Sequence, residues 1–235
     1  MGERIQIETP DGHFGAYLAR PAPSADTSPA IVVVQEIFGI NEDMRETCDN
    51  LAEQGYLALC PDLFWRMEPG VELSSFSEEE WKRGLAFYQA FDFGLGVDDI
   101  STTMAQAREM PGASGKVGVM GFCLGGLMTY LTAARCGADA AVAYYGGGTD
   151  QHLGEGVSLT SPLLMHLAEE DEYIDSLAQD RIQAALGNHP WVKIHTYAGQ
   201  QHAFARHRGV HYDALSAKLA NDRTSAFFRR HLMPG

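Results

Sequence analysis

Short apolar runs alternate with amphipathic stretches along most of this chain, and this alternation restricts the folds that the chain can adopt. The run "AIVVVQ" at residues 30–35 is continuously apolar and rich in β-branched residues, as in a strand buried on both faces. The next stretch, "NEDMRETCDNLAEQG", begins at the helix-capping Asn41, ends at Gly55 and carries apolar residues along one helix face. Strands that alternate with helices predict a mostly parallel sheet with helices on both faces.

The same alternation continues toward the C-terminus, and the N-terminal residues 4–20 predict an antiparallel hairpin around the turn "PDG". A Pro- and Ser-rich loop is expected over residues 21–29. Further strands are expected at residues 56–61, 116–122, 140–145, 162–167 and 192–197, and further helices at 77–89, 97–110, 124–136, 174–186 and 212–230. We therefore expect a single α/β domain over residues 1–235, with about seven or eight strands and helices on both faces of the sheet.

Composition limits the partners and the compartment. A formal net charge of −14 disfavours nucleic acid and anionic membrane surfaces, because the field of the protein repels phosphate. No apolar run approaches the roughly 18 residues that span a bilayer. The four cysteines show no paired-ligand spacing, which is typical of free thiols in a reducing compartment. We expect a cytoplasmic monomer that uses no cofactor and no metal.

The segment "GFCLG" places Cys123 directly after an expected strand and directly before an expected helix. It is a G-x-C-x-G version of the G-x-S-x-G nucleophile elbow. At such a turn the sulfur lies at a helix N-terminus, where a thiolate is favoured, and the N–H of Leu124 points to a developing oxyanion. The alternative is that Cys123 is a buried structural cysteine, and the other three cysteines are expected in the core or on helix faces.

An elbow nucleophile needs an acid and a histidine after later strands, in that order. Four acids at residues 169–172 follow one later strand, and the sequence does not choose among them, although a short Asp side chain suits a tight turn. His202 follows the next strand and is our candidate base, the alternative being a surface-loop histidine. His207 and His211 have a metal-like spacing, but no third ligand is evident.

The segment "QEIFG" ends the apolar run at residues 30–35 and places a carboxylate, Glu36, where burial is expected. An unpaired buried carboxylate costs several kcal/mol or becomes protonated, so Glu36 needs a reason to be there. One possibility is an ion pair with Arg45 or another arginine. In α/β-hydrolases this loop supplies the second N–H of the oxyanion hole, which here is expected from Ile37.

The elbow cysteine, the order of the site residues and "QEIFG" together resemble the dienelactone hydrolase family, the cysteine members of the α/β-hydrolase fold. The likeness extends over nearly the whole chain and includes "DGHFGAYLA", "QGYLALCPDL", "GKVGVMGFCLGG", "HAFAR" and "LANDRT". The resemblance implies a triad of Cys123, Asp171 and His202. It also implies that Glu36 contacts the resting thiol and helps to convert it into a thiolate once substrate is bound.

Family members that open dienelactones bind the free carboxylate of the substrate with two arginines and further polar groups. One of these arginines matches Arg206, but Trp81 stands where the resemblance predicts the other. The basic residues 82–83 are not automatic replacements, because successive helical residues point about 100° apart. Leu85 and Ala203 occupy positions at which the family carries hydroxyl groups. These departures change the groups expected to bind the substrate, and they leave the expected triad chemistry intact.

The expected function is cofactor-independent hydrolysis of a small, anionic enol-lactone of the carboxymethylenebutenolide type, formed in aromatic-ring degradation. The alternatives are a broad carboxylesterase with the same triad, or a non-catalytic thiol redox or metabolite-binding protein on a hydrolase scaffold. Four aromatic side chains are candidates for the pocket wall, and each is equally explained as core: Phe38, Trp81, Tyr88 and Tyr145. A preference for the cis or the trans dienelactone does not follow from the sequence.

Overall fold

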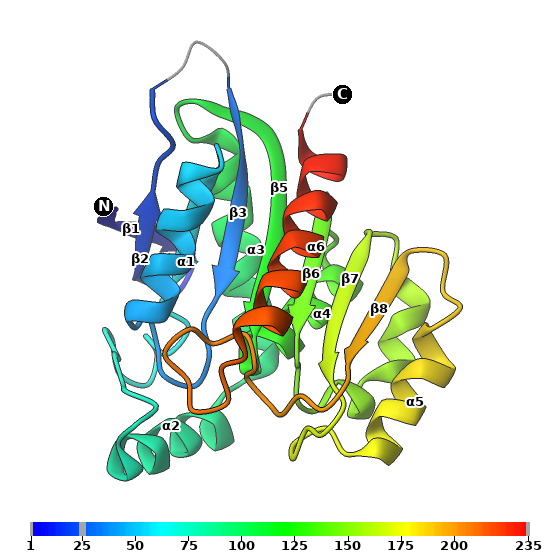
Figure 1. Ribbon diagram of the computed structural model, residues 1–235. Coiled ribbons are helices and arrows are strands. Elements are labelled where there is room, and N and C mark those ends of the chain that lie inside the picture. Colours follow the sequence, from blue (N-terminus) through cyan, green and yellow to red (C-terminus); the bar gives the residue numbers. More distant parts are fainter. Residues whose placement is uncertain (1, 24–26, 234–235) are drawn as a thin grey trace. The chain divides into compact units, whose positions relative to one another are not determined.

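The computed structural model describes residues 2–23 and 27–233 (Figure 1). Within these residues the chain divides into two compact units, Met1–Val119 and Met120–Gly235. Residues 24–26 of the loop expected at 21–29 lie outside the described part. The single domain expected over residues 1–235 stays a prediction, and each unit is described below by itself.

The first unit contains the predicted N-terminal hairpin and the buried strands that follow it. Its hairpin strands are β1 (Glu3–Thr9) and β2 (Gly12–Ala19), in register from Glu3 opposite Leu18 to Thr9 opposite Gly12. Strand β2 pairs antiparallel with β4 (Leu57–Pro61), and β4 pairs in parallel with β3 (Ser28–Val34). The strand order is β1-β2-β4-β3-β5, in which β5 (Ala113–Phe122) continues into the second unit.

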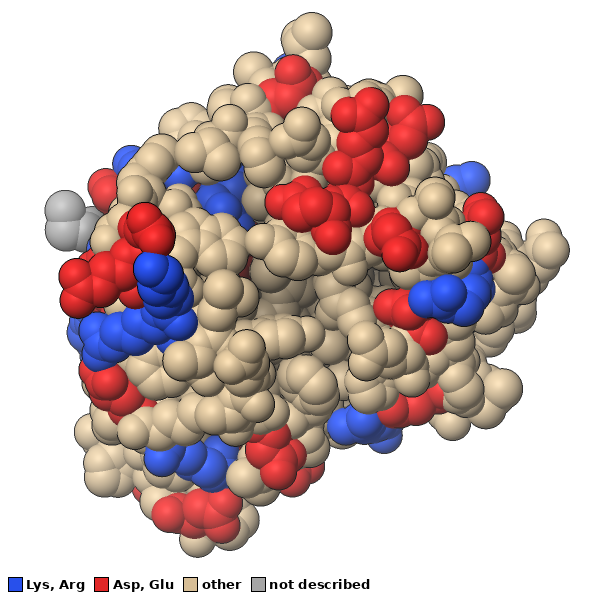
Figure 2. All heavy atoms as spheres, turned by 90° about the horizontal axis from the view of Figure 1, so that it is seen from below, with Lys and Arg blue, Asp and Glu red and all other residues tan. Residues whose placement is uncertain are grey.

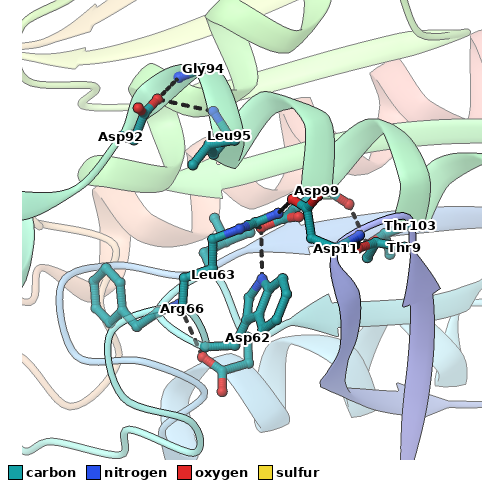
Figure 3. Close-up of polar contacts among 12 residues, drawn as sticks. Thr9, Asp11, Asp62, Leu63, Arg66, Asp92, Gly94, Leu95, Asp99 and Thr103 are labelled. Carbon is teal, nitrogen blue, oxygen red and sulfur yellow. Dashed lines mark hydrogen bonds and ion pairs between the residues drawn. The ribbon is translucent and has the colours of Figure 1, made fainter.

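Three helices of the first unit begin at capping side chains. Asn41 caps α1 (Glu42–Glu53), Ser77 caps α2 (Glu78–Ala90) and Asp92 caps α3 (Phe93–Glu109). In Figure 1, α1 lies in front of the strands and α3 lies behind β3. We predicted that this helix begins at residue 97, but α3 begins at Phe93. The earlier start is stabilised by Asp92, which accepts hydrogen bonds from two backbone N–H groups in the first turn (Figure 3).

A polar cluster around Asp99 holds the segment after β4 against α3 (Figure 3). Asp99 accepts hydrogen bonds from Trp65 Nε1, at 2.9 Å, and from the guanidinium of Arg66. Arg66 also pairs with Asp11 at 2.8 Å. Burial raises the pKa of Asp99, and the hydrogen bonds from Arg66 and Trp65 offset part of this increase. These carboxylates are explained by ion pairs within the fold.

The second unit contains three parallel strands that continue from β5. They are β6 (Ala140–Tyr144), β7 (Leu163–Ala168) and β8 (Val192–Tyr197), in the order β5-β6-β7-β8. Its helices are α4 (Leu124–Arg135), α5 (Ser176–Leu186) and α6 (Ala214–Leu232), and α6 lies in front of β6 in Figure 1 while α4 lies behind it. Two short 3₁₀ helices, Thr149–Gln151 and Leu153–Ser158, were not predicted. The predicted fold class, a mostly parallel sheet with covering helices, is confirmed.

The cysteines lie in the core or at helices, and charged residues cover the surface drawn in Figure 2. Cys48 and Cys60 are buried, and Cys136 is exposed at the C-terminal end of α4. Acidic side chains spread over the face drawn in Figure 2, and basic side chains form smaller groups between them. No helix among the described residues has the length and apolar character needed to cross a membrane.

Candidate active site

Cys123 lies at the turn between β5, which ends at Phe122, and α4, which begins at Leu124. Its backbone angles are φ 55° and ψ −115°, a conformation that non-glycine residues rarely adopt. The backbone N–H of Cys123 donates to the carbonyl oxygen of Tyr144 at 3.1 Å. The side chain is partly exposed. The strained strand-to-helix turn expected of a nucleophile elbow is therefore present in this chain.

Two glycines make this turn sterically possible. A Cβ on Gly121 would lie 2.2 Å from the carbonyl oxygen of Gly125, and a Cβ on Gly126 would lie 2.3 Å from the carbonyl oxygen of Tyr144. Both distances are far below van der Waals contact, and both neighbours are backbone atoms that cannot swing away. The "GFCLGG" glycines thus allow α4 to begin directly against β5 and β6.

The start of α4 brings backbone donors close to the sulfur. Leu124 is the first residue of the helix, so its N–H is among the first four, which have no acceptor within the helix. A helix N-terminus also favours negative charge, with a contribution of about 0.3–1 kcal/mol at an exposed site. The start of α4 therefore offers backbone donors to a negative charge that develops beside Cys123.

Tyr144 connects the elbow to a buried polar network. Its hydroxyl donates to Asn221 Oδ1 at 2.9 Å and lies 2.6 Å from the hydroxyl of Thr224. The imidazole of His166 bridges the Thr224 hydroxyl, at 3.0 Å, and the Tyr197 hydroxyl, at 2.8 Å. Burial holds the pKa of His166 well below its usual value. These bonds connect β6, β7 and β8 to α6 and hold the carbonyl group that accepts the Cys123 N–H.

Asp171 and His202 form a buried pair in the second unit. Asp171 follows β7 and His202 follows β8, at 4% and 3% exposure. His202 Nδ1 lies 3.0 Å from Oδ1 and 2.9 Å from Oδ2 of Asp171. The same Oδ1 accepts the backbone N–H groups of Tyr173 and Ile174, at 2.9 and 3.1 Å. The carboxylate is thus oriented by two backbone donors and by the imidazole.

The other three acids of this loop make different contacts or face solvent. Glu169 accepts the backbone N–H of Gly199 at 2.7 Å through its Oε2 atom. Glu170 and Glu172 are exposed. Asp171, chosen by the resemblance, is the acid of the four that is hydrogen-bonded to His202.

The charge of the Cys123 sulfur is the largest of the effects that raise the pKa of His202. Burial by itself would lower the pKa of His202, but the charge of Cys123 and the hydrogen bond to Asp171 raise the pKa to about 10. His202 is buried, and Cys123 raises the pKa of its imidazole through the charge of the sulfur and through a side-chain hydrogen bond. A thiolate at position 123 therefore keeps the imidazole protonated at neutral pH.

This electrostatic coupling is testable by NMR titration of the histidine ring protons. While Cys123 carries its negative charge, we expect the His202 resonance of the wild-type protein to titrate near pH 10. In Cys123→Ser the negative charge is absent, so the midpoint should fall by about one pH unit or more. His195 is the internal control, because burial and Arg223 lower its pKa and the substitution should not move it. An unchanged His202 midpoint would show that Cys123 does not act on the imidazole.

Two tyrosine rings contact His202 edge to face. The ring centroid of Tyr145 lies 5.1 Å from that of His202, and the ring centroid of Tyr173 lies at 4.8 Å. Tyr145, a predicted wall residue, is fully buried and has φ 35°. Tyr173 was missed by the sequence analysis. The only signal for it was its place two residues after Asp171.

The histidines beyond His202 make contacts within their own loop. His211 Nδ1 lies 3.1 Å from the carbonyl oxygen of His202, and the ring of His207 packs against Tyr212 at 5.2 Å. No cluster of three or more His, Cys, Asp or Glu side chains suited to a metal occurs among residues 2–23 and 27–233.

Arg206 is the predicted substrate-binding cation of the second unit. It is only 6% exposed, and its backbone N–H donates to the carbonyl oxygen of Ala203 at 2.9 Å. Ala203 has φ 64°, an unusual value for a residue with a β-carbon. The turn over residues 203–206 therefore places the buried Arg206 four residues after His202, the candidate base.

The remaining predicted residues lie in the first unit. Glu36 and Ile37 follow β3 and are 1% and 3% exposed. Glu36 is thus a deeply buried carboxylate, as expected. Arg45, considered as its ion-pair partner, donates to the carbonyl oxygen of Ile40 at 2.7 Å and pairs with Glu72.

Helix α2 packs an aromatic side chain against this segment. Phe38 is fully buried, and its ring meets Trp81 edge to face with 5.2 Å between centroids. Trp81 and Tyr88 are partly exposed, and Tyr88 contacts Phe93 at 6.1 Å. Phe38 is therefore as buried as a core residue. Trp81 packs against Phe38, but part of its side chain remains accessible to solvent.

The basic residues beside Trp81 are engaged in surface ion pairs. Lys82 Nζ lies 2.7 Å from Glu78 Oε1, one helical turn away, and Arg83 pairs with Glu68. Leu85 is 38% exposed. Both cations thus have carboxylate partners on the protein surface.

The fold and the elbow define a hydrolase of the α/β-hydrolase class, in which a nucleophile follows one strand and an acid and a histidine follow later strands. The sequence profile of the dienelactone hydrolase family matches residues 14–232. The chain belongs to the dienelactone hydrolase family.

Individual relatives agree over nearly the full chain. A carboxymethylenebutenolidase from Pseudomonas putida is 39% identical over 228 residues, which cover 97% of this chain and 96% of the relative. A provisionally named carboxymethylenebutenolidase from Azospirillum brasilense is 44% identical over 227 residues, with 94% and 95% coverage. The crystal structure of a provisionally named dienelactone hydrolase from Klebsiella pneumoniae subsp. pneumoniae is similar with a TM-score of 0.88 at 27% identity, with 98% of both chains covered.

Proposed function

We propose that this protein hydrolyses a small enol-lactone of the carboxymethylenebutenolide type through a Cys123, His202 and Asp171 triad. The observation that carries the proposal is the combination of a strained cysteine at the start of α4 with a buried pair of His202 and Asp171, joined at 2.9 Å. The activity named for the curated relatives in the same family supports the choice of substrate class.

In the first step the Cys123 thiolate attacks the lactone carbonyl carbon. The N–H of Leu124 stabilises the negative charge that develops on the carbonyl oxygen. The ring C–O bond then breaks, leaving a thioester on Cys123 and an enolate at the other end of the opened ring. An enolate is a stabilised leaving group and needs little help from a general acid. The imidazolium of His202 balances the thiolate charge before attack.

The second step uses the change in charge that acylation causes. In the thioester the sulfur carries no negative charge, so the largest cause of the raised pKa of His202 is removed. His202 gives its proton to the enolate of the opened ring, and the neutral imidazole can then accept a proton from the attacking water. Asp171 holds the ring by its Nδ1 atom, which leaves Nε2 for the water. Water then cleaves the thioester and restores the thiolate.

We also propose roles for the segment after β3 and for Arg206. The N–H of Ile37 is the second oxyanion donor, and the carboxylate of Glu36 controls ionisation of the resting thiol, as the family resemblance implies. Arg206 binds the free carboxylate of the substrate, because a guanidinium grips a carboxylate with two parallel hydrogen bonds. Trp81, Phe38, Tyr88 and Tyr145 contribute to the pocket wall.

The test is a substrate panel with the purified protein. We expect hydrolysis of a dienelactone, cis or trans, with a higher kcat/KM than that of neutral 4-nitrophenyl esters. Cys123→Ser should lose most of this activity, since a serine hydroxyl lacks the charge that pairs with His202. No hydrolysis of either isomer, or full activity in the serine variant, would refute the proposal.

A broad carboxylesterase is the second candidate, and specific observations favour it. Trp81, Leu85 and Ala203 replace the polar groups expected for carboxylate binding, and residues 82–83 are engaged in surface ion pairs. Faster turnover of neutral esters than of dienelactones would decide for this candidate.

A further inference from the structure

Tyr173 stands beside the candidate catalytic pair and has no role in the mechanism described above. It lies between Asp171 and α5, and its backbone N–H donates to Asp171 Oδ1 at 2.9 Å. Its ring meets the His202 ring at a centroid distance of 4.8 Å and an interplanar angle of 73°. Yet 51% of the residue is exposed. The Tyr173 ring therefore contacts the His202 imidazole, while about half of the residue is exposed to solvent.

The phenol also interacts electrostatically with the nucleophile and with the predicted anion-binding cation. Partial burial, Glu172 and the charge of Cys123 raise the pKa of Tyr173, whereas Arg206 acts in the opposite direction. The hydroxyl is therefore neutral at neutral pH and keeps its proton as a hydrogen-bond donor.

We propose that Tyr173 is a specificity residue whose hydroxyl donates a hydrogen bond to the carboxylate of an anionic substrate that Arg206 also binds. The proposal rests on the hydrolase function above. At Leu85 and Ala203 this chain has no hydroxyl groups, whereas Tyr173 places a phenol over His202. A neutral donor beside a guanidinium adds directional binding without adding charge. A neutral ester lacks the carboxylate and gains nothing from this bond.

The competing explanation is that the Tyr173 ring only covers the imidazole. Tyr173→Phe separates the two, because phenylalanine keeps the ring on His202 and removes the hydroxyl alone. Mono-(4-nitrophenyl) succinate serves as the anionic substrate and 4-nitrophenyl acetate as the neutral one. Tyr212→Phe is the matched control, since Tyr212 is also partly exposed and packs on His207 instead of His202.

We expect Tyr173→Phe to raise KM for the anionic ester about tenfold, the effect of losing about 1.4 kcal/mol from a hydrogen bond to a charged group. The KM for the neutral ester and both kcat values should stay within about twofold. Tyr212→Phe should change none of these constants. An unchanged KM for the anionic ester, or equal increases for both esters, would overturn the proposal.

Binding without turnover separates this proposal from the proposed function. In a Cys123→Ala background, calorimetry measures the dissociation constant of the anionic ester whether or not a lactone is a substrate. Adding Tyr173→Phe should raise this constant by the same tenfold factor. An increase here together with no hydrolysis of dienelactones would refute the lactone function and keep the role of Tyr173. An unchanged constant would refute the role of Tyr173 alone.

Discussion

His202→Ala is expected to lower kcat/KM by about 10⁴-fold, the usual range for removal of a triad member. Two functions are lost together. The imidazolium that balances the charge of the Cys123 sulfur disappears. The base that takes a proton from water during thioester hydrolysis also disappears. Steady-state kinetics with the best substrate of the panel measure the loss in both steps.

The matched control is His207→Ala in the same loop, because His207 is exposed and packs on Tyr212. It should leave kcat/KM within about twofold. Imidazole in the buffer should partly rescue His202→Ala and should have no effect on the control. Near-normal activity in His202→Ala would rule out this histidine as the base, provided that circular dichroism shows a folded protein.

Gly126→Ala is expected to destabilise the fold by about 3 kcal/mol, at the upper end of the usual cost of overpacking. The new Cβ would lie 2.3 Å from the Tyr144 carbonyl oxygen and 3.0 Å from the backbone of Gly146. Relief requires α4 to move away from β6. The same movement would displace the elbow, because the Tyr144 carbonyl oxygen also accepts the Cys123 N–H. Urea unfolding should show a lower midpoint, and activity should fall with it.

Gly154→Ala is the matched control, because a Cβ at Gly154 meets no atom within 4 Å. Its free energy of unfolding should stay within about 0.5 kcal/mol of the wild type. Equal stability of the two variants would contradict the steric explanation of the elbow.

Local patterns were sufficient for most of the fold. The hairpin, the buried strand β3 and the capped helix α1 depend on neighbouring residues, so their alternation and capping signals could be recognised. The early start of α3 was missed because Asp92 was not recognised as its cap. The 3₁₀ helices after β6 have no periodic apolar pattern.

The sequence alone determined the elbow at Cys123 and the order of the candidate site, because a strand, a tight glycine turn and a helix are local in the chain. The tertiary structure decided which acid meets His202. Asp171 and Glu169 are two residues apart, yet one binds the imidazole and the other binds the Gly199 N–H. The tertiary structure also placed the Tyr173 ring against the His202 ring. It brought Cys123 close enough for the charge of its sulfur to raise the pKa of His202. Such distances between separate loops depend on how the strands pack against one another. Local patterns of apolar and polar residues carry no information on that packing.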